Sequence, residues 1–238
     1  MVSPKNPYFA KAIVNRVWKQ FMGRGFVEEV DDFRVTNPPS HPQLLDALAA
    51  DLVSHKYDLR HLIRTILNSR AYQLSAEPNE SNRDDTLNYS YFRMRRLPAE
   101  ALLDIMSQTT GVEEKLNGYP PGTRAMQAYG TGGGYMLSSF GRLSRDIICE
   151  RDSQPDMAQT MHMIAGSTIQ KKVSGAKIDL ALDDSTLIDR VYLSSLVRHA
   201  SAQEREAIQA QIARGDRKTA YQDLLWAILN SKEFMYQH

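Results

Sequence analysis

Residues 7–22, PYFAKAIVNRVWKQFM, carry the pattern that decides the fold class. Their apolar side chains recur every four positions, which is the period of one face of an α-helix. The side chains that set this period are Phe9, Ile13, Val17 and Phe21. Gly23 and Gly25 follow at once, so the helix is predicted to end there.

Two further helices are predicted after it, joined as a hairpin through residues 55–57. Ser40 is the predicted N-cap of the first, with Pro42 in its opening turn. Asp58 is the predicted N-cap of the second. Their apolar faces are formed by Leu44, Leu45, Leu48 and Leu52 in one helix, and by Leu59, Leu62, Ile63, Ile66 and Leu67 in the other.

Helical patterns also fill most of the remaining chain, whereas patterns typical of strands are almost absent. A helix is predicted from Pro98 to the residue before Gly111, and others over 155–165, 186–198, 201–214 and 218–234. Polar residues 72–91 predict an exposed connection, and residues 117–141 a long irregular loop. We therefore predict an all-α fold: a multi-helix globular domain of antiparallel helix pairs with a long Gly/Pro-rich loop and little or no β-structure.

The length of 238 residues and the hydrophobic content of 42% are enough for a full core without a metal or a disulfide. We expect a single α-helical domain over residues 1–238. A division into lobes 1–111 and 142–238, joined by the loop 112–141, is the alternative.

Charge and cysteine content exclude several classes of function. Lys and Arg number 29 against 28 for Asp and Glu, so no net field would hold a polyanion, and we expect no nucleic-acid partner. Cys149 is the single cysteine, which excludes an intrachain disulfide and a zinc site built on cysteine pairs. No apolar run is long enough to cross a bilayer, and residues 1–5 lack the apolar core of a signal peptide. We expect a soluble chain without membrane insertion.

The densest group of reactive side chains lies in the stretch 31–41, DDFRVTNPPSH. The candidate catalytic residues there are Asp31, Asp32, Arg34, Asn37 and His41. Paired carboxylates can act as acid and base or hold a hard cation, and His41 can carry protons near neutral pH. The alternative is that the Asp and Asn side chains stabilise the turn while Arg34 pairs with a carboxylate.

Two histidine-containing groups suggest metal chemistry, but we assign no metal to either. His55 and His61 flank Asp58 and could approach each other across the hairpin turn; a capping Asp and two surface histidines explain this spacing equally well. A second group of Met157, Met161, His162 and Met163 would suit cuprous ion. Helical geometry instead favours ordinary core packing by these methionines.

Arginines, glycines and the cysteine supply further candidates. Arg95, Arg96 and Arg142 are the candidate binding residues, because arginines beside aromatic side chains can meet a carboxylate, a sulfate or the face of a sugar. Pairing with nearby acids is the alternative for each of them. Residues 130–134 predict a flexible loop or a lid. We expect Cys149 to be a buried thiol.

Several motifs together resemble a known family. They are NPYFA at 6–10, VNRVW at 14–18, GRG at 23–25, DDFR at 31–34, NPPSHP at 37–42, SRAYQL at 69–74, FGR at 140–142 and LWAILNSKEF at 225–234. The chain resembles, over nearly its whole length, the planctomycete-type domain of unknown function numbered 1553, found in large exported proteins. The resemblance supplies no established activity.

The resemblance implies an extracytoplasmic location, in the periplasm or at the cell surface, beside a cytochrome c-like module. This chain lacks the Cys-x-x-Cys-His that attaches haem, so we expect no cofactor in it and haem only on a separate module. The family often has a Cys-x-Cys pair before a Glu-Arg step. Here only Cys149 stands before Glu150 and Arg151, with Ile147 in the other position.

We expect a binding or assembly module of an exported multidomain envelope protein. Its expected partners are other domains of the same polypeptide or envelope proteins, with polysaccharide as a further candidate. The alternative is an enzyme, a hydrolase or redox accessory acting on an envelope or environmental polymer. That alternative requires the side chains of residues 31–41 to converge in one pocket.

Overall fold

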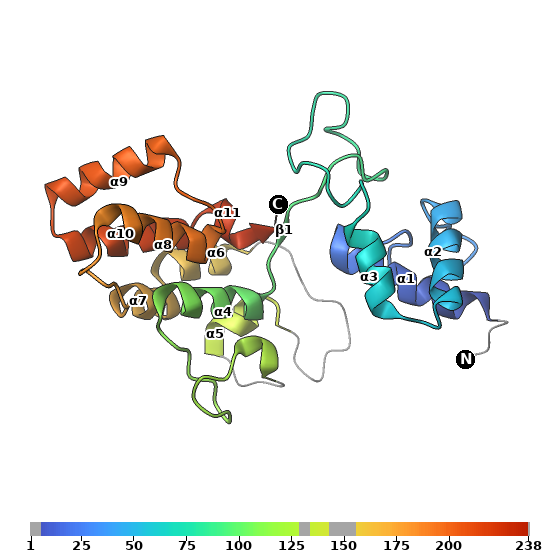
Figure 1. Ribbon diagram of the computed structural model, residues 1–238. Coiled ribbons are helices and arrows are strands. Elements are labelled where there is room, and N and C mark those ends of the chain that lie inside the picture. Colours follow the sequence, from blue (N-terminus) through green and yellow to red (C-terminus); the bar gives the residue numbers. More distant parts are fainter. Residues whose placement is uncertain (1–5, 129–133, 143–155, 238) are drawn as a thin grey trace. The chain divides into compact units, whose positions relative to one another are not determined.

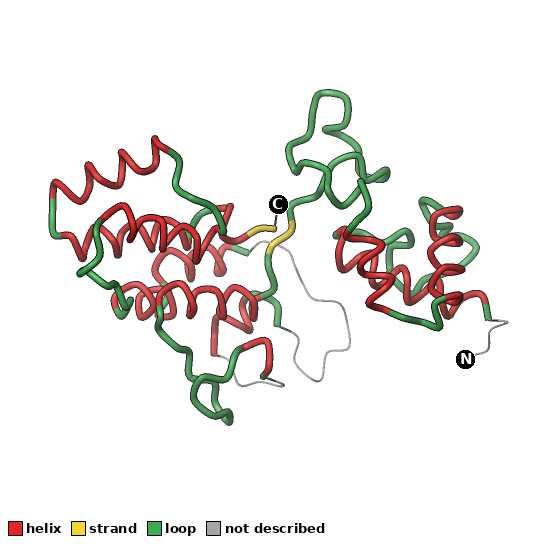
Figure 2. Tube along the Cα trace, in the orientation of Figure 1, coloured by secondary structure: helices red, strands yellow, loops and turns green. Residues whose placement is uncertain are grey.

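The computed structural model describes residues 6–128, 134–142 and 156–237. Nearly all of its regular structure is helical, which confirms the all-α prediction (Figures 1 and 2). The chain divides into two compact units, Met1–Arg95 and Arg96–Gln237. The division falls before the helix at 99–110, whereas the lobe boundary that we considered falls after it. The single domain over residues 1–238 stays a prediction.

The first unit contains α1 (Pro7–Met22), α2 (Pro42–Ser54) and α3 (Leu59–Leu67), and each of these helices contacts the other two. α1 has the predicted bounds, and it ends at Gly23, whose φ of 78° is a left-handed conformation that suits glycine. The helices enclose a core of Ala10, Val14, Trp18, Met22, Phe26, Leu45, Leu48, Ala49, Leu52, Leu62 and Ile66.

The two predicted caps of the hairpin have different outcomes. Asp58 caps α3 as predicted, because its carboxylate accepts hydrogen bonds from the backbone N–H groups of Arg60 and His61. The prediction for Ser40 is wrong: His41 is the N-cap of α2 and no side chain caps this helix. The backbone N–H of Ser40 instead donates to the carbonyl of Phe26, 2.8 Å away.

The second unit contains a larger helical core around α4 (Ala99–Thr110), which contacts α5 (Gly134–Ser139), α7 (Ser167–Ser174) and α8 (Asp184–Leu196). α10 (Arg217–Leu229) contacts α7 and α8 as well. The other elements of this unit are the 3₁₀ turn η1 (Ala125–Gln127), α6 (Met157–Ala165), α9 (Ala202–Arg214), α11 (Lys232–Met235) and the short strand β2 (Tyr236–Gln237). β2 pairs with β1 (Arg95–Arg96), which spans the boundary of the two units.

Three features of the second unit differ from the prediction. α7 has no predicted counterpart, and α5 lies inside the stretch 117–141 that was predicted to be irregular. The helix predicted over 218–234 is two helices, because the hydroxyl of Ser231 caps the second one by accepting from the backbone N–H of Phe234. The capping box at Ser201 and Glu204 is confirmed.

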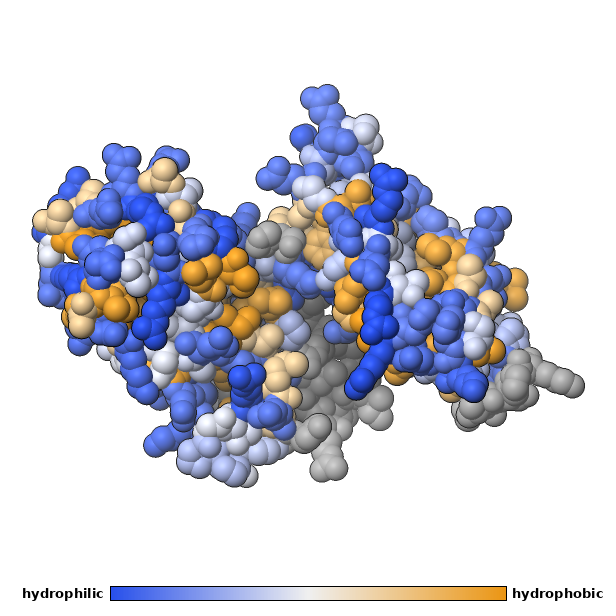
Figure 3. Space-filling model, viewed as in Figure 1, coloured by the Kyte–Doolittle hydropathy of each residue, from blue (hydrophilic) through white to orange (hydrophobic). Residues whose placement is uncertain are grey.

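Hydrophobic side chains also appear on the surface of both units (Figure 3). Among the helices of the described residues, none is long and apolar enough to cross a lipid bilayer.

Candidate functional site

The candidate residues of the stretch 31–41 lie in the loop between α1 and α2, where they pair within the first unit. The guanidinium of Arg34 donates through Nε and Nη2 to the two carboxylate oxygens of Asp32, each at 2.6 Å. This hydrogen-bonded ion pair lowers the pKa of Asp32 and raises the pKa of Arg34. Asp31 pairs in the same way with Arg16 of α1.

Asn37 and His41 also serve the loop itself. The Asn37 amide donates to the carbonyls of Glu28 and Asp32, at 2.8 and 3.0 Å. His41 Nδ1 lies 3.1 Å from the hydroxyl of Ser40. The two Asn37 contacts are of the kind that stabilises a turn, as the alternative to a catalytic site assumed.

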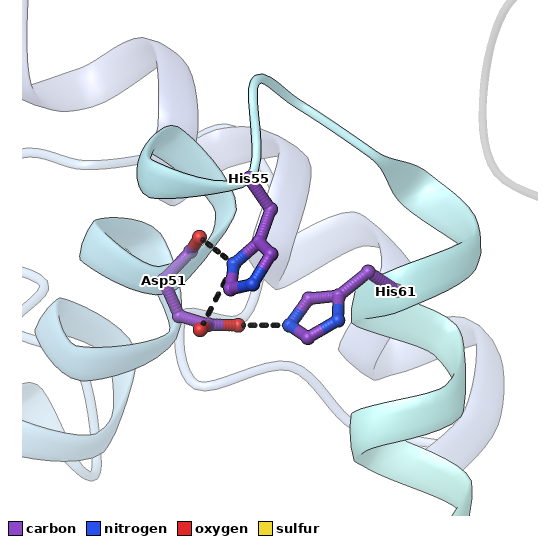
Figure 4. A group of neighbouring side chains, drawn as sticks. All are labelled: Asp51, His55 and His61. Atoms are coloured by element: carbon purple, nitrogen blue, oxygen red, sulfur yellow. Dashed lines mark hydrogen bonds and ion pairs between the residues drawn. The ribbon is translucent and has the colours of Figure 1, made fainter.

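The hairpin turn does bring His55 and His61 together, with their rings stacked 3.7 Å apart (Figure 4). The carboxylate that contacts both rings belongs to Asp51, not to Asp58. Asp51 and His55 are four residues apart around the end of α2, so their side chains lie on one face. This spacing was the sequence signal that could have identified Asp51.

The three candidate binding arginines lie in different surroundings. Arg95 donates to the carbonyl of Gln20 within the first unit. Arg142 is buried, where it donates to the carbonyl of Ala128 and lies 3.7 Å from the carboxylate of Glu100. Arg96 donates to Gln159, lies over the ring of Phe140 and lines a cavity. Arg96 is therefore the candidate arginine that could meet a ligand in a cavity.

That cavity has a volume of about 230 Å³ and lies within the second unit. Trp226 forms part of its wall and keeps 38% of its surface exposed. The indole N–H donates to the carbonyl of Ile164 at 3.0 Å, which fixes the orientation of the ring. The other lining residues are Arg96, Phe140, Asp156, Gln159, Thr160, Met163, Ile164, Asn230, Met235 and Tyr236.

A larger cavity of about 480 Å³ lies beside α4 and has an acidic lining that includes Asp104, Glu113 and Glu114. Asp104 already accepts from the backbone N–H groups of Ala125 and Met126. Glu114 lies 3.2 Å from the ammonium of the buried Lys172. Two of its acids therefore hold the fold together, and no aromatic side chain lines it.

The prediction that Met157 and Met161 are core residues is wrong. Both are on the exposed face of α6, with 77% and 58% of their surfaces exposed, and Ile164 follows on the same face at 45%. Met163 and His162 point into the core instead. Burial lowers the pKa of His162, so its imidazole is neutral at pH 7.

Residues 130–133 and Cys149 lie outside the described residues, and with them the predicted glycine loop and the predicted buried thiol. Gly134 begins α5.

Comparison with models of known protein families shows to which family the chain belongs. The model of the PSD1 family, described as a protein of unknown function (DUF1553), matches residues 1–212. The chain belongs to the PSD1 family. This confirms the resemblance to the domain numbered 1553. The chain matches no curated protein and no solved structure.

For this PSD1 domain, sequence reasoning missed the site residue Trp226. It lies within the apolar run LLWAIL of α10, which is typical of a buried helix. Its neighbours Leu225 and Ile228 are buried as such a run predicts, whereas Trp226 faces outward.

Proposed function

We propose that this PSD1 domain is a binding module of an exported multidomain envelope protein, and that its second unit binds one neutral sugar residue of a polysaccharide against Trp226. The observation that carries this proposal is the exposed indole in the cavity wall, held by its own N–H group. A ring fixed before binding loses little conformational freedom when a ligand stacks on it.

The chemistry of the cavity suits a sugar. The apolar face of an indole can stack on the face of a sugar ring. The hydroxyl groups at the edge of the sugar ring need both hydrogen-bond donors and hydrogen-bond acceptors from the protein. The side chains of Asn230 and Thr160 line the cavity and carry both kinds of group. Gln159 also lines it but is already bonded to Arg96 and to the carbonyl of Ser139. Arg96 and Asp156 carry opposite charges, which favours a ligand without net charge.

The size of the cavity favours a single ring. Pockets for drug-sized ligands have volumes of about 300–1,000 Å³, and this cavity, at about 230 Å³, is smaller. One sugar residue would occupy it, and the rest of a chain would continue over the surface. Binding of this kind requires no turnover, in keeping with a module without enzymatic activity.

The hydrolase or redox alternative receives no support from the stretch 31–41. Asp31, Asp32, Arg34 and Asn37 are engaged in ion pairs and turn contacts of their own loop. A haem group, if the full-length protein has one, would belong to a separate module.

The exposed face of α6 supports a second candidate function, which is docking of another domain of the same polypeptide. Met157, Met161 and Ile164 form an apolar stripe that ends at the Ile164 carbonyl bonded to Trp226. Flexible methionine side chains adapt well to a partner surface. Replacing both methionines with serine would weaken this docking without removing the cavity.

Affinity electrophoresis in gels that contain soluble neutral polysaccharides tests the sugar proposal. We expect the chain to be retarded and Trp226→Ala to lose the retardation. Tyr8→Ala is the matched control, because Tyr8 is an exposed aromatic residue of the other unit, and it should be retarded like the wild type. The proposal fails if no neutral polysaccharide retards the chain, or if both variants behave alike.

A further inference from the structure

We propose that Asp51, His55 and His61 form a binding site for one divalent transition-metal ion of the zinc type. Each residue offers one ligand atom, and these three atoms lie within 4.8 Å of one another. The site belongs to the first unit, so it is independent of the sugar cavity of the second.

The ligand atoms already face one another (Figure 4). His61 Nε2 lies 2.8 Å from Asp51 Oδ2, and His55 Nδ1 lies 3.3 Å from Asp51 Oδ1. Two ligands of a tetrahedral zinc ion are separated by about 3.4 Å, given bond lengths near 2.1 Å. The separation at His55 is close to this value and the separation at His61 is shorter. To bind an ion, the carboxylate and the His61 ring would move apart slightly, and His55 Nδ1 would exchange its contact with the Asp51 backbone carbonyl, 2.9 Å away, for the metal.

The chemistry of the ligands selects the metal. Two imidazole nitrogens and one carboxylate oxygen suit zinc and its neighbours in the first transition row, whereas calcium and magnesium prefer oxygen ligands throughout. His55 keeps 47% of its side chain exposed, His61 30% and Asp51 35%. Solvent can therefore reach the site and supply the remaining coordination position.

The hairpin holds the ligands on two helices. His55 ends α2 with its backbone N–H bonded to the carbonyl of Asp51 at 3.1 Å. His61 lies in the first turn of α3, where Asp58 accepts from its backbone N–H. Leu52 and Leu62 anchor the two helices in the core with no exposed surface. A bound ion would therefore bridge α2 and α3 and stabilise the hairpin.

Isothermal titration of the chelator-treated chain with ZnCl₂ tests the proposal. We expect one Zn²⁺ per chain and a rise in melting temperature with added zinc. His55→Ala and His61→Ala should each weaken binding by at least about tenfold, the loss caused even by removing a residue that merely supports a ligand. His41→Ala, which removes a histidine of the same unit outside the cluster, should bind like the wild type.

The conservative variant Asp51→Asn distinguishes the loss of a metal ligand from the loss of the fold. It keeps the size of the side chain but removes its charge, and circular dichroism reports whether the helices persist. We expect a folded variant with weakened zinc binding. Absence of zinc binding in the wild type, or equal binding by the wild type and folded variants of all three residues, would overturn the proposal and leave two stacked histidines that are hydrogen-bonded to Asp51.

Discussion

The side chain of Asn15 holds the backbone of Val27 from both sides. Its Nδ2 donates to the Val27 carbonyl at 2.9 Å, and its Oδ1 accepts from the Val27 N–H at 3.1 Å. The same Nδ2 donates to the carbonyl of Val30. Asn15 is completely buried, so water cannot replace these bonds. This residue of α1 therefore fixes the start of the loop that carries Asp31 and Asp32.

Asn15→Ala should lower the free energy of unfolding of the chain by about 2–4 kcal/mol, because buried backbone groups would lose their partners. Urea denaturation followed by circular dichroism measures the change. Asn37→Ala is the control, since Asn37 also bonds two carbonyls but is only half-buried. Water can replace its bonds, so its effect should stay below about 1 kcal/mol. Equal losses in the two variants would contradict this account.

The pH dependence of stability should show the buried imidazole of His162. Burial lowers its pKa from the ordinary value of 6.5, so the unfolded chain binds a proton before the folded chain does. The contribution of His162 to the free energy of unfolding is therefore fully present above pH 6.5 and decreases as the pH falls below it. His162→Phe should remove this part of the decrease, as melts at pH 7.5 and below pH 6.5 would show. An unchanged pH profile would argue against a neutral His162 in the core.

Acid stability should depend on the pair of Arg198 and Glu204. The hydrogen-bonded guanidinium lowers the pKa of Glu204 from 4.5 to about 2. This pair stabilises the folded chain above pH 4.5, and its contribution is lost as the pH falls towards 2. Glu204→Gln keeps the capping box with Ser201 but has no charge. The difference in stability between wild type and variant should therefore shrink from pH 4.5 to 2; a constant difference would refute the assignment.

The methionines of α6 should differ in their effect on stability. Met163 is buried in the core, so Met163→Ala should cost about 2–5 kcal/mol. Met157→Ala and Met161→Ala change exposed side chains and should stay within about 0.5 kcal/mol. Thermal and urea denaturation of the three variants measure this. A large loss at Met157 or Met161 would mean that these side chains are covered.

The sequence predicted features that depend on local chemistry. The bounds of α1 and the cap at Asp58 follow from residues within one or two turns of each other. The cap at Ser40 was wrong because its backbone N–H bonds the distant Phe26. A tertiary contact of this kind leaves no local pattern.

Burial was harder to predict than helix formation. The period of α6 correctly groups Met157 and Met161 on one face, but it does not say whether that face meets the core. Lys172 shows that residue type alone does not settle burial either: lysines usually lie on the surface, yet the ammonium of Lys172 is buried and bonded to Ser107 and the carbonyl of Val112. The candidate sites depended on the same information, which is why Trp226 was missed.

The fluorescence of Trp226 tests the central claim most directly. Trp18→Phe removes the other tryptophan, which is buried in the first unit, so that all tryptophan emission comes from Trp226. A neutral oligosaccharide that binds against the indole should change its emission in a saturable way, with a dissociation constant that agrees with the retardation in gels. An emission that stays constant at all oligosaccharide concentrations, in a variant with an unchanged melting temperature, would contradict the sugar-binding account.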